Sequence, residues 1–251
     1  MAYEQYRPNS FKVLPAVVKN LLIINVLFFL ASYAVEKQYN IDLANYLGLH
    51  YFSSGLFKPY QLVTYMFMHG SIEHILFNMF ALWMFGNVLE NFWGPKRFLI
   101  FYMITGIGAA LIQLLVAYIR LQSLYSQIPA DELHYLLTNG TQIIQDGKNF
   151  INPIAAEANI IINGATIGAS GAVFGILVGF GLLFPNTELF LMFIPIPIKA
   201  KYAVILYAVI ELVSGVAQVE GDNIAHFAHL GGALFGFILV KYWQRNKKQI
   251  F

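Results

Sequence analysis

The chain has 251 residues, of which 58% are hydrophobic and 11% charged, and its formal net charge is +2. A water-soluble domain carries about 25% charged residues, so this chain has too few polar groups to cover a globular surface. The small net charge, with basic residues dense only at the C-terminus, argues against nucleic-acid binding. The lack of cysteine excludes disulfides, thiolate metal sites and a cysteine nucleophile. Composition therefore predicts a polytopic all-α membrane protein.

Apolar stretches long enough to cross a bilayer, which takes about 20 residues, occur six times. We expect spans over residues 16–35, 72–92, 98–119, 168–184, 202–219 and 224–242. Between them we expect two longer extra-cytoplasmic loops, 36–69 and 121–163, and a short turn at 220–223. The first apolar run lacks a small-residue cleavage site and is long enough to remain as an anchor. Without an internal repeat, residues 1–251 are expected to form a single membrane domain.

Basic residues indicate how the spans are oriented, because Lys and Arg accumulate on the cytoplasmic side. Most of the 15 basic residues lie in the N-terminal segment, in the turns after the second and fourth spans, and at the C-terminus. Both termini are therefore expected in the cytoplasm. The second, fourth and sixth spans then run from outside to inside.

Three polar side chains are expected in one layer of the membrane, where polar groups are costly and mark functional sites. Counting outward from the cytoplasmic boundary, at a rise of about 1.5 Å per residue, places Asn78, Ser170 and His229 at roughly 21–23 Å. In a hydrocarbon core of about 30 Å, this layer is about 8 Å below the outer surface. His74 lies one turn above Asn78, on the same face of the second span.

Small residues predict which spans touch. Glycines recur every four residues in the fourth span from Gly171, and Gly232 and Gly236 follow His229 on its own face. Faces of small residues let helix backbones approach closely. If the fourth and sixth spans pack through these glycines, Ser170 and His229 meet.

A serine hydroxyl becomes a nucleophile when a neighbouring base removes its proton, and histidine is suited to this role near neutral pH. We therefore expect Ser170 to be the nucleophile and His229 the base. His74, Asn78 and the backbone N–H of Ser170 can donate hydrogen bonds to the oxyanion of a tetrahedral intermediate. No acidic residue is expected in this layer, so we predict a dyad whose base is oriented by packing against Phe174.

Three strings identify the chain with a known family: His-Ile-Leu-Phe-Asn (74–78), Gly-Ala-Ser-Gly (168–171) and Ala-His-Leu-Gly-Gly (228–232). In order and in position on the second, fourth and sixth spans, they resemble the signatures of rhomboid intramembrane serine proteases, across nearly the whole chain. The resemblance implies a serine endopeptidase that cleaves single-span membrane proteins near the outer end of their transmembrane segment, without a cofactor.

The residues of these strings carry the roles that the resemblance implies. Ser170 is the nucleophile and His229 the general base, while His74 and Asn78 stabilise the oxyanion. The remaining members support the site; they are Phe174, Gly168, Gly171 and Gly232.

The resemblance further implies that the loop before the second span lies partly in the membrane and that residues 220–223 cap the site. Many family members carry Trp-Arg in the first loop, where this chain has Tyr60 and Gln61. This departure concerns the anchoring of the loop rather than the chemistry. We expect the protein in the bacterial plasma membrane, with lipid and single-span proteins as partners. The sequence assigns neither an oligomeric state nor a role for segment 121–163.

Other residues allow further interpretations. His226, one turn above His229, could form a zinc site with it. Such a site needs a third ligand and a general base, and no H-E-x-x-H motif is present, so we expect no metal and place His226 at the cavity mouth. Glu211, in the fifth span, is interpreted as a structural hydrogen-bonding residue, and His50 as solvated.

Two other classes of function compete with a protease. A catalytically inactive rhomboid-like protein would bind membrane helices without cutting them, but Ser170 and His229 are both intact. A transporter or channel needs a polar path across the membrane, whereas the inner halves of the expected spans are almost wholly apolar.

Overall fold

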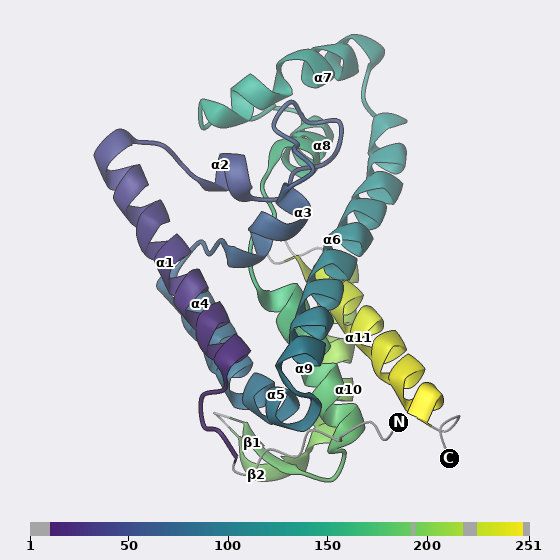
Figure 1. Ribbon diagram of the computed structural model, residues 1–251. Coiled ribbons are helices and arrows are strands. Elements are labelled where there is room, and N and C mark those ends of the chain that lie inside the picture. The colour runs from purple at the N-terminus through teal and green to yellow at the C-terminus, as the bar shows by residue number, and fades with distance from the viewer. Residues whose placement is uncertain (1–10, 192–193, 218–224, 248–251) are drawn as a thin grey trace.

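The computed structural model describes residues 11–191, 194–217 and 225–247, and it is a bundle of helices (Figure 1). The six expected spans correspond to α1 (Ala16–Tyr39), α4 with α5 (Ile72–Ala81 and Asn87–Trp93), α6 (Pro95–Tyr125), α9 (Ser170–Leu183), α10 (Ala200–Ala217) and α11 (His226–Lys247). Among the described residues, four of these segments are long and apolar enough to cross a membrane alone: α1, α4–α5, α6 and α10. The predicted fold class, an all-α polytopic membrane bundle, is confirmed.

Three expected features fall partly or wholly outside this description. Positions 218–219 of the fifth expected span and position 224 of the sixth are not among the described residues. The turn 220–223, expected to cap the site, also lies outside them.

α1 begins and α11 ends at the same end of the bundle, here called the inner end, and α7 and α8 lie at the opposite, outer end (Figure 1). The carboxylate of Glu90, in α5, accepts hydrogen bonds from the N–H groups of Val17 (3.0 Å) and Val18 (2.8 Å). These donors belong to the first turn of α1 and have no partner within the helix. Glu90 therefore caps α1 and ties it to the second span.

The second span continues from α4 to α5 through a π-helical turn, Leu82–Gly86. Its start is fixed by Ser71, whose hydroxyl accepts a 3.1 Å hydrogen bond from the N–H of His74, as is typical of a helix N-cap. It ends at Gly94, whose φ of 83° is left-handed, and Pro95 then begins α6.

α9 is a short central helix, packed against α6 and α11. Its 14 residues span about 21 Å, less than the hydrocarbon core of about 30 Å. Close packing with α6 depends on small residues: a methyl group on Gly175 would lie 2.5 Å from Cβ of Thr105. The start of α9, with Ser170, is therefore sunk below the outer end of the longer helices.

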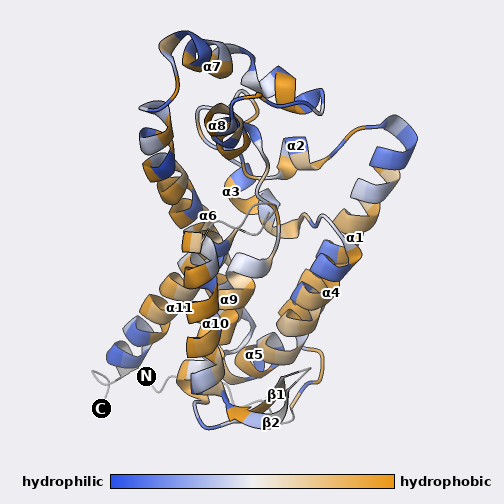
Figure 2. Cartoon of the chain, turned by 180° about the vertical axis from the view of Figure 1, so that it is seen from behind, coloured by the Kyte–Doolittle hydropathy of each residue, from blue (hydrophilic) through white to orange (hydrophobic). Residues whose placement is uncertain are grey.

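The outward faces of the bundle are apolar. Exposed side chains include Leu27 and Leu30 on α1, and Leu212, Val213 and Val216 on α10. Figure 2 shows apolar residues along the helices and hydrophilic ones gathered toward the ends, around α7 and at the end of α11. Contiguous exposed apolar surface is rare on soluble proteins, and here it suits contact with lipid chains.

Segment 121–163, expected as an extra-cytoplasmic loop, contains helices that the sequence analysis did not predict. It continues α6 to Tyr125 and then forms α7 (Ala130–Gln145) and α8 (Pro153–Asn163). Asn152 caps the start of α8, because its side chain accepts a 3.0 Å hydrogen bond from the N–H of Ile154. α7 and α8 pack on the end of α6 through a small buried apolar cluster that includes Leu121, Leu136 and Ile162, and end caps and polar contacts add to this packing.

The first loop contains α2 (Ala44–Leu47), α3 (Gln61–Thr64) and a 3₁₀ turn, Tyr65–Phe67. Its packing against α8 buries His50, whose Nδ1 lies 3.0 Å from the carbonyl oxygen of Asn163. The expectation that His50 is solvated is wrong, because α8 covers it.

A hairpin that the sequence did not predict joins α9 to α10 at the inner end. Strands β1 (Glu188–Leu191) and β2 (Ile194–Lys199) are antiparallel, with Glu188 opposite Lys199. Pro195 and Pro197 disfavour a helix in this apolar run, so it pairs as strands.

Candidate active site

Ser170 and His229 meet at the outer end of α9 and α11. Ser170 is the first residue of α9, and His229 lies in the first turn of α11. The Oγ atom of Ser170 is 2.7 Å from Nε2 of His229. His229 is buried, whereas Ser170 is partly exposed. A nucleophile and a base within hydrogen-bond reach are the arrangement that nucleophilic catalysis needs.

Glycines bring the two helices this close, as the sequence predicted. A methyl group on Gly232 would overlap the carbonyl oxygen of Gly171, and one on Gly236 would lie 2.9 Å from the carbonyl oxygen of Gly175. The backbones of α9 and α11 are thus in direct contact. No larger residue fits at Gly232 without moving the helix that carries His229.

The ring of His229 lies flat against that of Phe174. The two centroids are 4.4 Å apart and the planes are inclined by only 5°. Tyr207 of α10 contacts Phe174 edge-on, with centroids 6.4 Å apart. The expected packing of Phe174 against the base is therefore present, and it fixes the plane of the imidazole.

Glu211 has a partner that the sequence did not reveal. Its Oε2 atom lies 2.9 Å from Nδ1 of His229 and 2.7 Å from Nδ1 of His226. All three side chains are buried. The expectation that no acidic residue lies in the Ser170 layer is wrong, because the long side chain of Glu211 reaches it from α10.

His74 and Ser170 both lie against Gly168. A methyl group on Gly168 would lie 2.8 Å from Nε2 of His74 and 3.4 Å from Oγ of Ser170, and the φ of 129° disfavours any side chain there. Asn78 is buried, and its amide donates a 2.9 Å hydrogen bond to the carbonyl of His74. The structure thus places His74 beside the nucleophile, with Asn78 one turn further along the same helix.

His69 is a neighbour of the site that the sequence argument treated only as a support of the first loop. It is buried, and its ring meets that of His74 edge-on, with centroids 5.0 Å apart. Burial, followed by the proximity of His74, lowers the pKa of His69 to about 4. It therefore packs as a neutral ring at pH 7. Its position five residues before His74, just ahead of the helix cap, was the available signal.

Glu211, His226 and His229 offer ligand atoms within 4.8 Å of one another, and two imidazoles with a carboxylate are a donor set that zinc accepts. Tetrahedral zinc would keep its ligand atoms about 3.3 Å apart. Here Oε2 is 2.7 Å and 2.9 Å from the two Nδ1 atoms. Those are hydrogen-bond distances, so the cluster is satisfied by its own groups.

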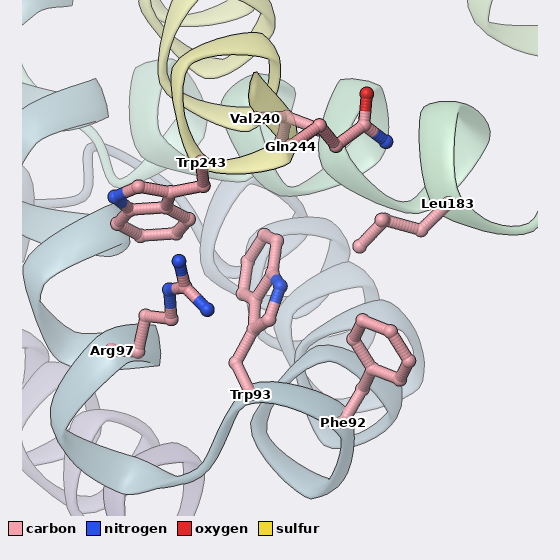
Figure 3. Close-up of a pocket in the computed structure, with 7 residues that line it drawn as sticks. All are labelled: Phe92, Trp93, Arg97, Leu183, Val240, Trp243 and Gln244. Carbon is pink, nitrogen blue, oxygen red and sulfur yellow. The ribbon is translucent and has the colours of Figure 1, made fainter. Parts of the chain in front are cut away.

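A separate cavity of about 220 Å³ opens at the inner end of the bundle, lined mainly by apolar and aromatic side chains (Figure 3). The guanidinium carbon of Arg97 lies 4.3 Å from the centroid of the Trp243 ring. Leu183, which also lines the cavity, follows Ser170 by about 20 Å along α9. The cavity is therefore not part of the candidate active site.

Comparison with known proteins gives a consistent family. The model of the rhomboid domain matches residues 56–126 and 132–245. Rhomboid protein 1 of Saccharomyces cerevisiae, a mitochondrial protein, is 29% identical over 172 residues, which cover 68% of this chain and 38% of that protein. An uncharacterized mitochondrial rhomboid protein of Schizosaccharomyces pombe is 26% identical, over 95% of this chain and 68% of its own length.

A chloroplastic protein of Arabidopsis thaliana, Rhomboid-like protein 11, is 26% identical over 82% of this chain and 63% of its own length. The expectation of a bacterial plasma membrane is contradicted by these relatives, which point to the membrane of a eukaryotic organelle. Basic residues orient helices in a membrane but do not distinguish one membrane from another. The family model matches most of the length of this chain, which shows that the chain belongs to the rhomboid family, a family that includes serine proteases.

Proposed function

We propose that this chain is an intramembrane serine endopeptidase that cleaves single-span membrane proteins near the outer end of their transmembrane segment. The observation that carries the proposal is the 2.7 Å distance between Oγ of Ser170 and Nε2 of His229. Membership of a family that includes serine proteases supports it. The relatives' names favour the membrane of a eukaryotic organelle as its site of action, with that membrane's lipids and single-span proteins as partners.

In the acylation half of the reaction, Oγ of Ser170 attacks the carbonyl carbon of the scissile bond while its proton passes to Nε2 of His229. A tetrahedral intermediate forms with a negative oxygen. When it collapses, the C–N bond breaks and His229 gives the proton to the leaving amine. The product is an acyl-enzyme ester on Ser170 and a released amino fragment.

In the deacylation half, a water molecule attacks the ester carbonyl while His229 takes its proton. Collapse of the second tetrahedral intermediate breaks the ester C–O bond, and the proton returns to Oγ of Ser170. The carboxyl fragment leaves. The partial exposure of Ser170 is consistent with the entry of this water.

The negative oxygen needs donors that are already in place. His74 and Asn78 on α4, together with the N–H of Ser170 at the start of α9, are assigned this role. The close approach of the His74 ring to Gly168 supports the assignment, because it sets an imidazole nitrogen beside the serine. Gly168 and Gly171, on either side of Ser170, leave room only for small substrate residues.

The experiment compares the wild-type protein with the Ser170→Ala variant, both purified. Each is incubated with a panel of single-span substrates and, separately, with a fluorophosphonate, which labels activated serines. We expect the wild type to cut and to be labelled, Ser170→Ala to do neither, and EDTA to have no effect. Equal cleavage by Ser170→Ala, or inhibition by EDTA that zinc reverses, would refute the proposal. A wild type that binds substrate but is neither active nor labelled would identify an inactive helix-binding member instead.

A further inference from the structure

One carboxylate oxygen lies between two imidazoles at the candidate site. Oε2 of Glu211 is 2.7 Å from Nδ1 of His226 and 2.9 Å from Nδ1 of His229, while Nε2 of His229 is 2.7 Å from Oγ of Ser170. We propose that Glu211 is the positioning residue of the base, so that the reaction runs on a Ser–His–Glu triad. The inference rests on the proposed function and concerns how its base is held.

The contacts determine which nitrogen of His229 carries the proton. An ionised carboxylate only accepts hydrogen bonds, so Nδ1 of His229 must donate to Glu211. Nε2 is then left with its lone pair directed at the hydroxyl of Ser170. This is the tautomer that a general base requires, and the contact with Glu211 selects it.

Packing against Phe174 alone cannot direct Nε2 of His229 at Ser170. The ring of Phe174 holds the imidazole of His229 in one plane, but a half-turn about the Cβ–Cγ bond keeps that plane and exchanges the ring nitrogens for carbons. After such a turn, neither the bond to Ser170 nor the bond to Glu211 could form. Glu211 fixes the one orientation in which Nε2 faces the nucleophile.

His226 holds Glu211 in turn. It lies three residues before His229, on the same face of α11, and its ring is nearly perpendicular to that of His229, at 86°. The carboxylate oxygen that receives both Nδ1–H groups is therefore held from two directions. Such a network, in buried surroundings that exclude competing water, is stronger than the same bonds in solvent.

The carboxylate also acts during the reaction. When Nε2 of His229 takes the proton of Ser170, the ring becomes a cation whose charge lies next to Glu211. The proton on Nδ1 stays in place, and Glu211 stabilises the imidazolium without being protonated. The stabilisation is present in the transition state and absent in the ground state, so it raises kcat rather than substrate affinity.

The test uses the purified full chain with three variants: Glu211→Gln, Glu211→Asp and, as the matched control, Glu157→Gln. Glu157 forms an ion pair with Arg120 at 2.6 Å, on α8 and away from the site. We expect Glu211→Gln to lower kcat by up to about 10⁴-fold, the loss seen when the acid of a triad is removed, with KM little changed. Glu211→Asp should recover part of the loss, and Glu157→Gln should match the wild type.

A second measurement does not depend on how the variants fold. In wild-type protein with ¹⁵N-labelled histidine, NMR should find the proton of His229 on Nδ1, in a strong hydrogen bond. A neutral His229 protonated on Nε2 would overturn the inference, as would a well-folded Glu211→Gln with wild-type kcat. In both cases the proposed function stands as long as Ser170→Ala is inactive. An inactive wild type would instead refute the proposed function itself.

Discussion

Gly232 of α11 lies so close to Gly171 of α9 that a methyl group on Gly232 would overlap the carbonyl oxygen of Gly171. The contact is three residues after His229 and one after Ser170, so it sets the distance between the two reacting side chains. A separation of the helices by even 1 Å would misplace the base. A misplacement of that size lowers the reaction rate by about 10²-fold.

Gly232→Ala should therefore lower kcat by about 10²-fold or more and lower the melting temperature, since α9 and α11 must move apart. Gly55→Ala is the matched control, because the nearest atom to its added methyl group would be 3.6 Å away, an ordinary contact. Activity assays and thermal unfolding in detergent would measure both effects. Wild-type activity in Gly232→Ala would contradict the role of this contact.

The meeting of Ser170 and His229 could be predicted from the sequence because it depends on two simple properties. Helix rise converts residue number into depth, and glycines at intervals of four mark the faces that touch. The same argument did not place Glu211 near His229. The depth estimate uses the rise of the helix backbone, whereas the side chain of a glutamate extends several ångströms from its helix. Glu211 therefore reaches His229 although its backbone position does not place it in the Ser170 layer.

The helices α7 and α8 and the strands β1 and β2 were missed for a different reason. A search for apolar stretches of about 20 residues passes over short strands and over helices such as α7 and α8, each of which has one apolar face that packs on other parts of the chain. Asn163 illustrates this: its side-chain oxygen accepts hydrogen bonds from Ser54 (2.7 Å) and Thr141 (2.9 Å), residues distant in sequence. Such pairings cannot be read from one segment alone.

Asn78→Ala tests the oxyanion assignment. A donor that acts mainly on the transition state raises kcat and leaves substrate binding nearly unchanged. We expect kcat to fall by about 10- to 1000-fold, with KM little affected, in steady-state assays of a soluble-tagged single-span substrate. A rise in KM at constant kcat would show that Asn78 binds substrate instead.

Gln61 anchors the first loop in place of the Trp-Arg found in many family members. Its side chain is fully buried; its oxygen accepts hydrogen bonds from the N–H groups of His50 and Lys58, and its nitrogen donates to the carbonyls of Tyr46 and Leu56. Removal of the side chain would leave these backbone groups buried and unpaired, at a cost of about 2–4 kcal/mol.

We therefore expect Gln61→Ala to unfold at a lower denaturant concentration and to expose the first loop to protease. Gln127→Ala, in which an exposed side chain that donates to Ser123 is lost, should behave like the wild type. Equal stability of the two variants would show that the loop is anchored elsewhere.

His50 should make the stability of the protein depend on pH. Burial lowers the pKa of His50 below its ordinary value of 6.5, and the hydrogen bond to Asn163 opposes this only in part. The native state thus disfavours the protonated ring, so the contribution of His50 to stability is complete above about pH 6.5 and is lost as the pH falls below it. The slope is at most about 1.4 kcal/mol per pH unit.

Chemical unfolding at several pH values, for wild type and His50→Gln, measures this slope. His69, whose pKa is also lowered by burial, contributes equally to both proteins, so the difference between them isolates His50. We expect His50→Gln to lose less stability between pH 7 and pH 5. Parallel curves would contradict the prediction.

The last prediction concerns which substrates are cut, and where. Ser170 lies at the sunken start of α9, about 8 Å below the outer surface by helix rise, so the scissile bond must reach that depth from the outer end. A transmembrane helix keeps its backbone carbonyls in its own hydrogen bonds, and Ser170 cannot attack one until the segment unwinds. Substrates should therefore carry Gly, Pro or polar residues in the outer part of the span, with small residues at the cut because Gly168 and Gly171 border the serine.

The test uses two single-span substrates, one with a Gly-rich outer segment and one with that segment replaced by Leu. Mass spectrometry maps the cut in each. We expect cleavage in the outer part of the first and at least a tenfold slower reaction with the second, since unwinding a leucine helix costs more (about 1 kcal/mol per Gly-to-Leu exchange in helix propensity). A cut near the inner end, or equal rates, would contradict both the depth of the serine and the need for unwinding.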